Sequence, residues 1–156
     1  MSILEAIRQL LSAGGAEFRE LEHEPTPTSE DSARVRGEPL SVGAKALLLK
    51  IDDAFGLFVL PADRKLDSAA IKAALNAKKS RFATPDELLA RTGLVPGCVP
   101  PFGQPILPFE LWADIHVGTS HGRVAFNAGS LTHSIIMSTS DWERIAKPRR
   151  LSFAKT

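Results

Sequence analysis

The sequence predicts an α+β protein whose strands form a mixed, largely antiparallel sheet with helices at its periphery. Apolar residues recur at helical spacing over residues 3–13, and the run stops at the glycine pair 14–15. Two apolar strands are predicted at residues 41–50 and 55–61. The chain has 156 residues with no internal repeat and no linker, so residues 1–156 are expected to form a single domain.

The first half of the chain also predicts a strand, a second helix and a hairpin. Residues 18–23 alternate between apolar and polar side chains, which is typical of a short strand. After a turn at residues 25–28, Ser29 opens a short helix that ends near Gly37. Residues 52–54 make a tight connection between the two apolar strands, which predicts an antiparallel hairpin.

Two helices follow the hairpin, and another closes the chain. Residues 66–77 are predicted to be helical. A shorter helix over residues 84–91 begins with the sequence TPDE, which combines a capping box with proline in the first turn. Residues 140–143 are expected to cap the final helix, which Pro148 ends.

A long irregular loop and three strands are predicted between these helices. Residues 93–108 are rich in proline and contain a Phe-Gly step, which precludes regular structure over much of the loop. Rigidity in a long loop usually serves a site. Strands are predicted at residues 107–117, 123–127 and 134–137, and the first two flank a turn at residues 119–122.

The composition favours a cytoplasmic protein. The chain has 19 Lys and Arg against 18 Asp and Glu, so its net charge is +1. This charge gives no electrostatic indication of stable binding to a nucleic-acid duplex. A single cysteine, Cys98, rules out an intramolecular disulfide. We find no signal peptide and no apolar run long enough to span a membrane. The basic runs at residues 78–81 and 147–150 are interpreted as solvated surface.

Lys45 is the most informative residue of the chain. It stands at the mouth of an apolar strand, beside a glycine and two alanines that leave room for a ligand. An ammonium group is costly to desolvate, so lysine is uncommon in such a position. Lys45 is therefore either a cation in a pocket for an anionic or carbonyl-bearing ligand, or a strand-edge lysine that reaches solvent.

Three further places carry candidate site residues. Asp114, in a predicted strand, is either a partner for a cation or an outward-facing strand residue. Glycine-containing loops occur at 100–103 and 127–130, and they would let a ligand approach main-chain N–H groups closely. The candidate substrate-binding residues in these loops are Pro101, Phe102, Gly103, Asn127, Gly129 and Ser130.

Known catalytic and metal-binding motifs are absent. The four histidines lack ligand spacing, so no metal site and no cofactor are expected. Cys98 would need a base and an activating environment to act as a nucleophile, and it is more simply a small packed residue. The sequence therefore predicts no protein nucleophile.

Four segments together resemble the YbaK/prolyl-tRNA synthetase editing-domain family. They are KALLLK at residues 45–50, FVLP at 58–61, GCVPPFG at 97–103 and NAGS at 127–130, and the match runs in order from about residue 17 to residue 146. The resemblance implies a curved mixed sheet with flanking helices. It also implies hydrolysis of the ester between a wrongly attached amino acid and the 3′ acceptor end of a tRNA, with an aminoacyl-tRNA synthetase as a further partner.

The resemblance also suggests residue roles. In this family the lysine that matches Lys45 is the residue most often tied to activity, and neither a protein nucleophile nor a metal is obligatory. We therefore expect Lys45 to hold the ester and to stabilise developing negative charge. Main-chain N–H groups near Gly129 and Ser130 would polarise the carbonyl while water or a substrate group attacks.

The amino acid removed is not specified by the resemblance. Phe126 is followed by Asn127, where the alanine-specific branch has a histidine, and Gly129 and Ser130 replace the Gly-Arg pair of the cysteine-specific branch. Two other functions stay open at this point. One is an inactive tRNA- or protein-binding module of the same fold. The other is a hydrolase of small aminoacyl esters that does not require tRNA.

Overall fold

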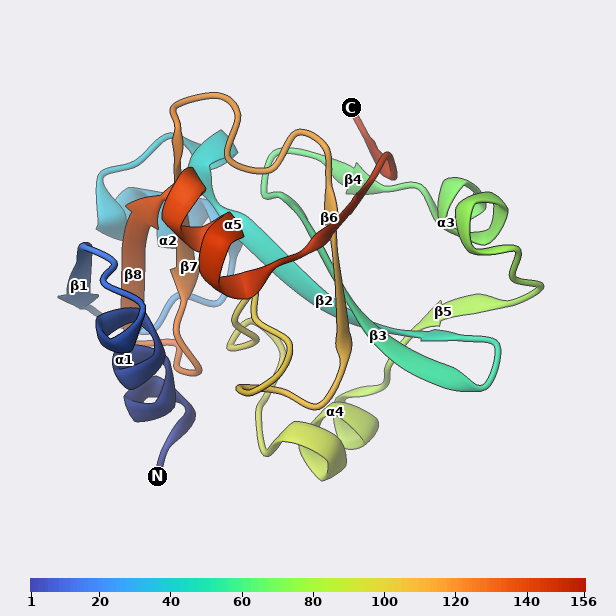
Figure 1. The fold of residues 1–156 in the computed structure, drawn as a ribbon, viewed down its shortest axis with the longest axis horizontal. Helices are drawn as coiled ribbons and strands as arrows, with labels where there is room; N and C mark the ends of the chain where they lie inside the picture. Colours follow the sequence, from blue (N-terminus) through green and yellow to red (C-terminus); the bar gives the residue numbers. More distant parts are fainter.

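The computed structural model describes residues 1–156 as five helices around three sheets (Figure 1). The helices are α1 (Ile3–Ala13), α2 (Ser29–Arg36), α3 (Ser68–Leu75), α4 (Pro85–Thr92) and α5 (Thr139–Ala146), with a 3-10 turn η1 (Leu40–Val42). The strands are β1 (Phe18–Glu22), β2 (Ala44–Ile51), β3 (Ala54–Pro61), β4 (Lys65–Leu66), β5 (Ser80–Phe82), β6 (Glu110–Asp114), β7 (Arg123–Asn127), β8 (His133–Ser138), β9 (Arg149–Leu151) and β10 (Ala154–Lys155). The predicted α+β class is confirmed.

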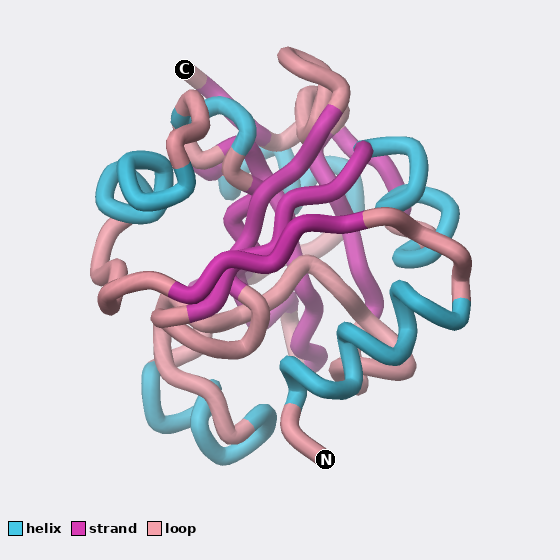
Figure 2. The backbone as a smooth tube through the Cα atoms, turned by 90° about the vertical axis from the view of Figure 1, so that its left-hand side faces the viewer, coloured by secondary structure: helices cyan, strands magenta, loops and turns pink.

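The larger sheet has the strand order β5-β2-β3-β6-β9. Its centre is the predicted hairpin of β2 and β3, which are antiparallel with Lys45 opposite Leu60. Asp52 closes the hairpin turn with a φ of 51°, in the left-handed region that aspartate tolerates. β6 runs parallel to β3, and β9 runs parallel to β6. Figure 2 shows the strands crossing at the centre of the molecule, with helices around them.

The smaller sheet has the order β1-β8-β7, all antiparallel. The main hydrophobic core lies against one of its faces and extends under α1 and α5, where Ile7, Leu11 and Trp142 are fully buried. A second cluster covers the opposite face of the larger sheet, where Phe58 packs edge-on against Phe153 at 5.6 Å. The larger sheet therefore separates the two main clusters, and a third, small cluster of Val42, Ala125 and Ile136 lies at the smaller sheet.

One prediction about strands was wrong. Residues 107–117 and 123–127 were expected to flank one turn, but β6 and β7 belong to different sheets. β6 is also shorter than predicted and ends at Asp114, whose carboxylate accepts the His116 N–H in the turn that follows. The basic runs at 78–81 and 147–150 lie largely at the surface, as expected, and they also contribute residues to β5 and β9. An edge strand pairs through its backbone and can still expose charged side chains.

The end of the chain differs in detail from the sequence prediction. Ser138, rather than Ser140, caps α5 by accepting a hydrogen bond from the Asp141 N–H at 3.1 Å. Lys147, in the left-handed conformation, ends the helix one residue before Pro148. No helix in the structure has both the length and the apolar character needed to cross a bilayer.

The two sheets meet at Gly43, the residue immediately before β2. Gly43 makes an isolated parallel bridge to Ala125 of β7. A Cβ at Gly43 would lie 2.9 Å from the Cβ of Ala62, so a larger residue does not fit without a shift. On the same edge β5 pairs only with residues Leu49 to Ile51 of β2. The edge of β2 between the bridge and β5 therefore has no strand partner.

The start of α4 gives a pH-dependence prediction. Thr84 and Glu87 form the predicted capping box, and Arg81 binds the Glu87 carboxylate at 2.7 Å. The hydrogen bond from Arg81, and then that from the Thr84 backbone, lower the pKa of Glu87 from 4.5 to about 2. Since the folded-state pKa is depressed, the stabilisation is present above the unfolded value and is lost as the pH falls from about 4.5 towards 2.

We expect the carboxyl resonance of Glu87 to titrate near pH 2 in an NMR experiment. In Arg81→Ala the midpoint should move up towards the ordinary value for glutamate, because the hydrogen bond from Arg81, the largest cause of the lowered pKa, is removed. Lys78→Ala, a nearby charge change that leaves the pair intact, is the control. An unchanged midpoint in Arg81→Ala would contradict the assignment of the shift to this ion pair.

Candidate functional site

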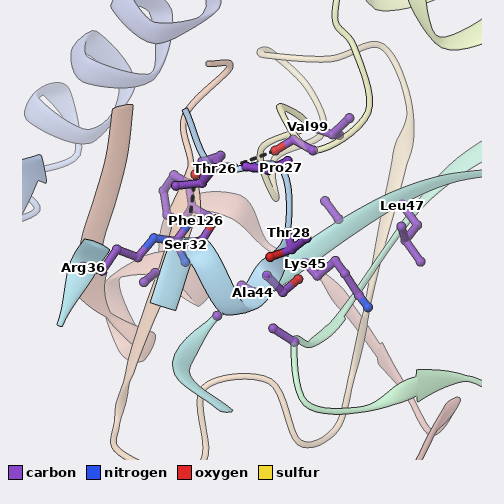
Figure 3. Close-up of a pocket in the computed structure, with 17 residues that line it drawn as sticks. Thr26, Pro27, Thr28, Ser32, Arg36, Ala44, Lys45, Leu47, Val99 and Phe126 are labelled. Atoms are coloured by element: carbon purple, nitrogen blue, oxygen red, sulfur yellow. Dashed lines mark hydrogen bonds between the residues drawn. The ribbon is translucent and has the colours of Figure 1, made fainter. Parts of the chain in front are cut away.

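A cavity of about 210 Å³ lies at the unpaired edge of β2 (Figure 3). Segments distant in sequence build its wall: the turn before α2 and one face of that helix, the start of β2, the beginning of the proline-rich loop and the end of β7. The residues that line the cavity include Thr26, Ser32, Arg36, Gly43, Lys45, Ala46, Gly97, Val99 and Asn127. The site therefore forms where the two sheets and α2 meet.

Lys45 lies in the wall of this cavity and is partly buried. Its ammonium group has no carboxylate within 4.0 Å, so none of the ion pairs of the structure uses it. In Figure 3 the Lys45 amine points away from Arg36, which enters the view from the opposite side. Lys45 is thus a cation without a protein partner at one side of the cavity.

The main chain of Ala46 also faces this space. Ala62 donates to the Gly43 carbonyl on the β3 side at 2.9 Å, whereas Ala83 donates to the Leu48 carbonyl on the opposite side at 2.9 Å. Successive residues of a strand direct their peptide groups to alternate edges, so Ala46 shares the outward direction of Leu48. Because no strand covers this stretch, Ala46 offers one N–H donor and one C=O acceptor to a ligand.

Arg36, the last residue of α2, is the second cation of the cavity. Its Nε donates to Ser134 Oγ at 2.9 Å and its Nη2 donates to Asn127 Oδ1 at 3.0 Å. Burial lowers the pKa of the Arg36 guanidinium to about 10, against a smaller opposing effect of Glu38. Glu38 itself is bound to Arg123 at 2.7 Å, and no carboxylate lies within 4.0 Å of Arg36. The guanidinium stays charged at neutral pH.

Asn127, a predicted substrate-binding residue, does line the cavity, but its amide is already engaged. The Oδ1 atom accepts from Arg36 and, at 3.2 Å, from Ser134 Oγ. The Nδ2 atom donates to the Gly97 carbonyl at 2.8 Å and to Thr26 Oγ1 at 3.5 Å. Asn127 therefore ties α2, β8 and the proline-rich loop together and orients Arg36, which makes it a positioning residue.

The predicted residues of the proline-rich loop lie elsewhere. The Pro101 carbonyl accepts a hydrogen bond from the Trp142 indole at 3.0 Å, and Phe102 is 1% exposed in the core. A Cβ at Gly103 would lie 2.6 Å from the Phe109 carbonyl oxygen, so the glycine serves close packing at a separate surface hollow. The loop contributes Gly97 and Val99 to the cavity in place of these three.

Gly129 and Ser130 are also outside the cavity wall. The Gly129 N–H donates to the Cys98 carbonyl at 3.0 Å, and a Cβ at this position would lie 2.8 Å from Ile3 of α1. The Ser130 hydroxyl is within 2.9 Å of the Thr132 hydroxyl and accepts from the Thr132 N–H. The Gly129 N–H is thus committed within the fold and does not face the cavity, in contrast to the expected carbonyl-polarising role.

Asp114 is a structural carboxylate. It is 0% exposed, and its Oδ1 accepts the N–H groups of Phe153 and Ala154, each at 2.8 Å. Its Oδ2 accepts the His116 N–H at 2.9 Å. Neither expected reading holds, since Asp114 faces neither solvent nor a cation at the cavity. Buried carboxylates are stabilised by several backbone N–H donors as well as by cations.

Thr26, Arg36, Gly97 and Val99 were missed as cavity residues. One signal for α2 was present in the sequence: Ser29, Ser32 and Arg36 are spaced i, i+3 and i+7, so they share one helical face. That face is polar, and in a surface helix it would be solvated. The structure turns it towards the cavity.

No activated nucleophile was found among the groups near the cavity. Cys98 is buried, and burial raises the pKa of its thiol. The Ser134 hydroxyl is within 2.8 Å of His23 Nε2, but it is fully buried and also bonded to Arg36 and Asn127. No group of three His, Cys, Asp or Glu side chains is placed to hold a metal ion. The arrangement instead offers two cations and a strand edge, which together suit a ligand with anionic or carbonyl oxygens.

Comparison with known proteins gives one family. The model of the aminoacyl-tRNA editing domain matches residues 23–145. The chain is 36% identical to the multifunctional Ser/Thr-tRNA deacylase ProXp-y of Escherichia coli (strain K12), over 94% of this chain and 90% of that protein. It is also 33% identical to the proline--tRNA ligase of Bacillus pumilus, over 80% of this chain and 22% of that enzyme.

Solved structures share the fold. A protein proposed to be a trans-editing enzyme for prolyl tRNA synthetase superposes with a TM-score of 0.83 and 19% identity, covering 100% of this chain and 99% of that one. The hypothetical protein APE2540 gives a TM-score of 0.80 at 24% identity, covering 96% of this chain and 99% of the other. At these identities the likeness establishes the fold and not the activity.

Proposed function

The chain belongs to the aminoacyl-tRNA editing domain family, and from this we propose that it is a trans-acting aminoacyl-tRNA deacylase. Residues 1–156 would act as one editing domain, since the match to the deacylase relative covers 94% of this chain and 90% of that protein. The observation that carries the proposal is the cavity at the edge of β2, where Lys45 has no protein partner. In an aminoacyl-tRNA, the ester joins the amino acid to the terminal adenosine, which carries a phosphodiester. That phosphate can bind a cation that has no carboxylate partner in the protein.

The substrate would be the 3′ acceptor end of a tRNA that carries a wrong amino acid, and we propose serine or threonine. The E. coli relative is a Ser/Thr-tRNA deacylase. The cavity is small, and hydroxyl side chains of Thr26, Thr28 and Ser32 lie in its wall. The Thr26 and Thr28 hydroxyls donate to the Leu131 carbonyl and to Asp31 Oδ2, so they can accept from a substrate hydroxyl, and Ser32 can accept or donate. A synthetase of the prolyl type is the proposed partner in delivering the tRNA, because proline--tRNA ligases contain a similar segment.

In the proposed reaction Lys45 binds the phosphate next to the terminal adenosine and so fixes the ester at the cavity. The exposed edge of Ala46 accepts a hydrogen bond from the α-ammonium group of the aminoacyl moiety. Water then attacks the ester carbonyl carbon, and the bond from that carbon to the ribose oxygen breaks. One proton of the water goes to the ribose oxygen and the other to solvent, which leaves a free amino acid carboxylate. No protein nucleophile is needed.

We expect the protein to hydrolyse seryl- and threonyl-tRNA about 10-fold or more faster than alanyl-tRNA, because a site that binds a hydroxyl rejects the analogue that lacks it. The measurement is release of the amino acid from a panel of mischarged tRNAs, run beside the matching 3′-aminoacyl adenosines. Retained tRNA binding with no hydrolysis of any ester would indicate an inactive binding module. Equal efficiency on the adenosine esters would indicate a small-ester hydrolase.

A further inference from the structure

We infer that Arg36 binds the acyl carbonyl oxygen of the substrate and stabilises the oxyanion that forms when water attacks it. The inference rests on the proposed function, and it adds a catalytic residue to that site. It replaces the expected contribution of the main chain near Gly129, whose N–H is bonded to Cys98. It also separates the roles of the two cations, leaving Lys45 to bind phosphate.

The first argument is the geometry of the guanidinium. Neutral acceptors hold two of its three nitrogens, with Ser134 at Nε and Asn127 at Nη2. The third, Nη1, makes no hydrogen bond within the protein and lies beside Gly43, where a Cβ would come within 3.8 Å of it. Both residues line the cavity. Arg36 is thus fixed in orientation and keeps one side free for a ligand.

The second argument is charge. A desolvated guanidinium is normally compensated by a carboxylate, and six other arginines of this chain have one within 4.0 Å: Arg8, Arg34, Arg81, Arg123, Arg144 and Arg150. Arg36 has only the neutral side chains of Ser134 and Asn127. The nearest acidic residue in sequence, Glu38, is bound to Arg123. A negatively charged oxygen in the cavity would supply the missing compensation.

The third argument is the change of charge along the reaction. The carbonyl oxygen is neutral in the ester, becomes negative in the tetrahedral intermediate and shares the charge of the carboxylate in the product. A fixed cation therefore binds the transition state more strongly than the ester, which is the condition for raising kcat. Phosphate carries the same charge throughout, so the residue that binds it contributes chiefly to substrate affinity.

The test compares Arg36→Ala and Arg36→Lys with the matched control Arg34→Ala. Arg34 lies on the same helix but is exposed, outside the cavity wall and paired with Glu24 at 3.1 Å. We expect Arg36→Ala to lower kcat on seryl-tRNA by about 100- to 1,000-fold with a smaller change in KM. Arg36→Lys keeps the positive charge but lacks the planar guanidinium group, so its kcat should fall less. Added guanidinium ion should restore part of the activity of Arg36→Ala. Arg34→Ala should match the wild type.

A second measurement uses the unaltered protein, so it does not depend on the folding of a variant. The Arg36 side-chain ¹⁵N resonances, assigned through their correlations with the backbone of residue 36, should shift when serine is added and stay in place with serinol, which lacks the carboxylate. Normal kcat in a folded Arg36→Ala protein, or resonances that ignore serine, would overturn the inference. So would a loss confined to seryl and threonyl esters, which would assign Arg36 to the side-chain hydroxyl. Failure of the wild type on every ester would instead refute the proposed deacylase activity.

Discussion

Replacing Lys45 with alanine is expected to lower kcat/KM for aminoacyl-tRNA by about 10- to 150-fold, the equivalent of about 1.5–3 kcal/mol for a hydrogen bond to a charged group. The loss should appear mainly in KM, because the phosphate that Lys45 binds has the same charge in the ester and in the transition state. The folded state should be unaffected. Lys45 has no ion-pair partner in the protein, so its removal leaves no group uncompensated.

The salt dependence of this variant separates a phosphate contact from other roles. For single-stranded nucleic acid, each phosphate contact contributes about 0.7 to the slope of log affinity against log salt. Lys45→Ala should therefore reduce that slope by about this amount. Lys50→Ala is the control, since Lys50 is on the same strand but lies over the Phe55 ring at 5.9 Å. An unchanged KM and slope in Lys45→Ala would refute the phosphate assignment.

The parts of the fold that depend on local pattern were predictable from the sequence. The first helix, the capping box of α4 and the β2–β3 hairpin lie where periodicity and turn residues placed them. Pairing between distant segments was not predictable in the same way. β9 pairs with β6 across more than thirty residues, and its basic side chains gave no strand signal. Strand propensity reflects burial and neighbours, which a single sequence does not reveal.

The site shows the same division. Lys45 could be found because a lysine in an apolar strand conflicts with its surroundings. The proline-rich loop does line the cavity, but through Gly97 and Val99 and not through the predicted Pro101, Phe102 and Gly103. Arg36 could not be found, because an arginine in the last turn of a polar helix is favourable for the helix dipole alone. Its place beside the edge of β2 depends on contacts between distant segments, with Arg36 bonded to Ser134 and Asn127 and Gly43 bridged to Ala125.

That bridge explains why the cavity exists. It holds Gly43, the residue before β2, against the smaller sheet, while β5 begins to pair only at Leu49. Between the two contacts the strand edge is open and is faced by α2 and the start of the proline-rich loop. A sheet edge usually invites pairing with another chain. Here it lies in the wall of a cavity that α2 and the proline-rich loop also line, and under the proposed function its ligand is an aminoacyl group.

Replacing Asp114 with alanine is expected to give the largest loss of stability among the residues considered, about 3 kcal/mol or more. The carboxylate accepts three backbone N–H groups, from His116, Phe153 and Ala154, and each buried donor left without a partner costs about 1–3 kcal/mol. For a protein of this size the melting temperature should fall by about 6–12 °C. The C-terminal segment should detach first, because two of the three donors belong to it.

Asp114→Asn is the matched variant that separates this structural role from a catalytic one. Its carbonyl oxygen can still accept from Phe153 and Ala154, whereas its amide group opposes the His116 N–H, so about one third of the loss should remain. At a temperature where both variants are folded, kcat per folded molecule should equal that of the wild type, because Asp114 lies outside the cavity wall. An Asp114 variant with normal stability and no activity would show instead that Asp114 belongs to the functional site. The Asp114 carboxylate binds N–H donors in the chain that follows β9, so thermal unfolding is the measurement that reports its role.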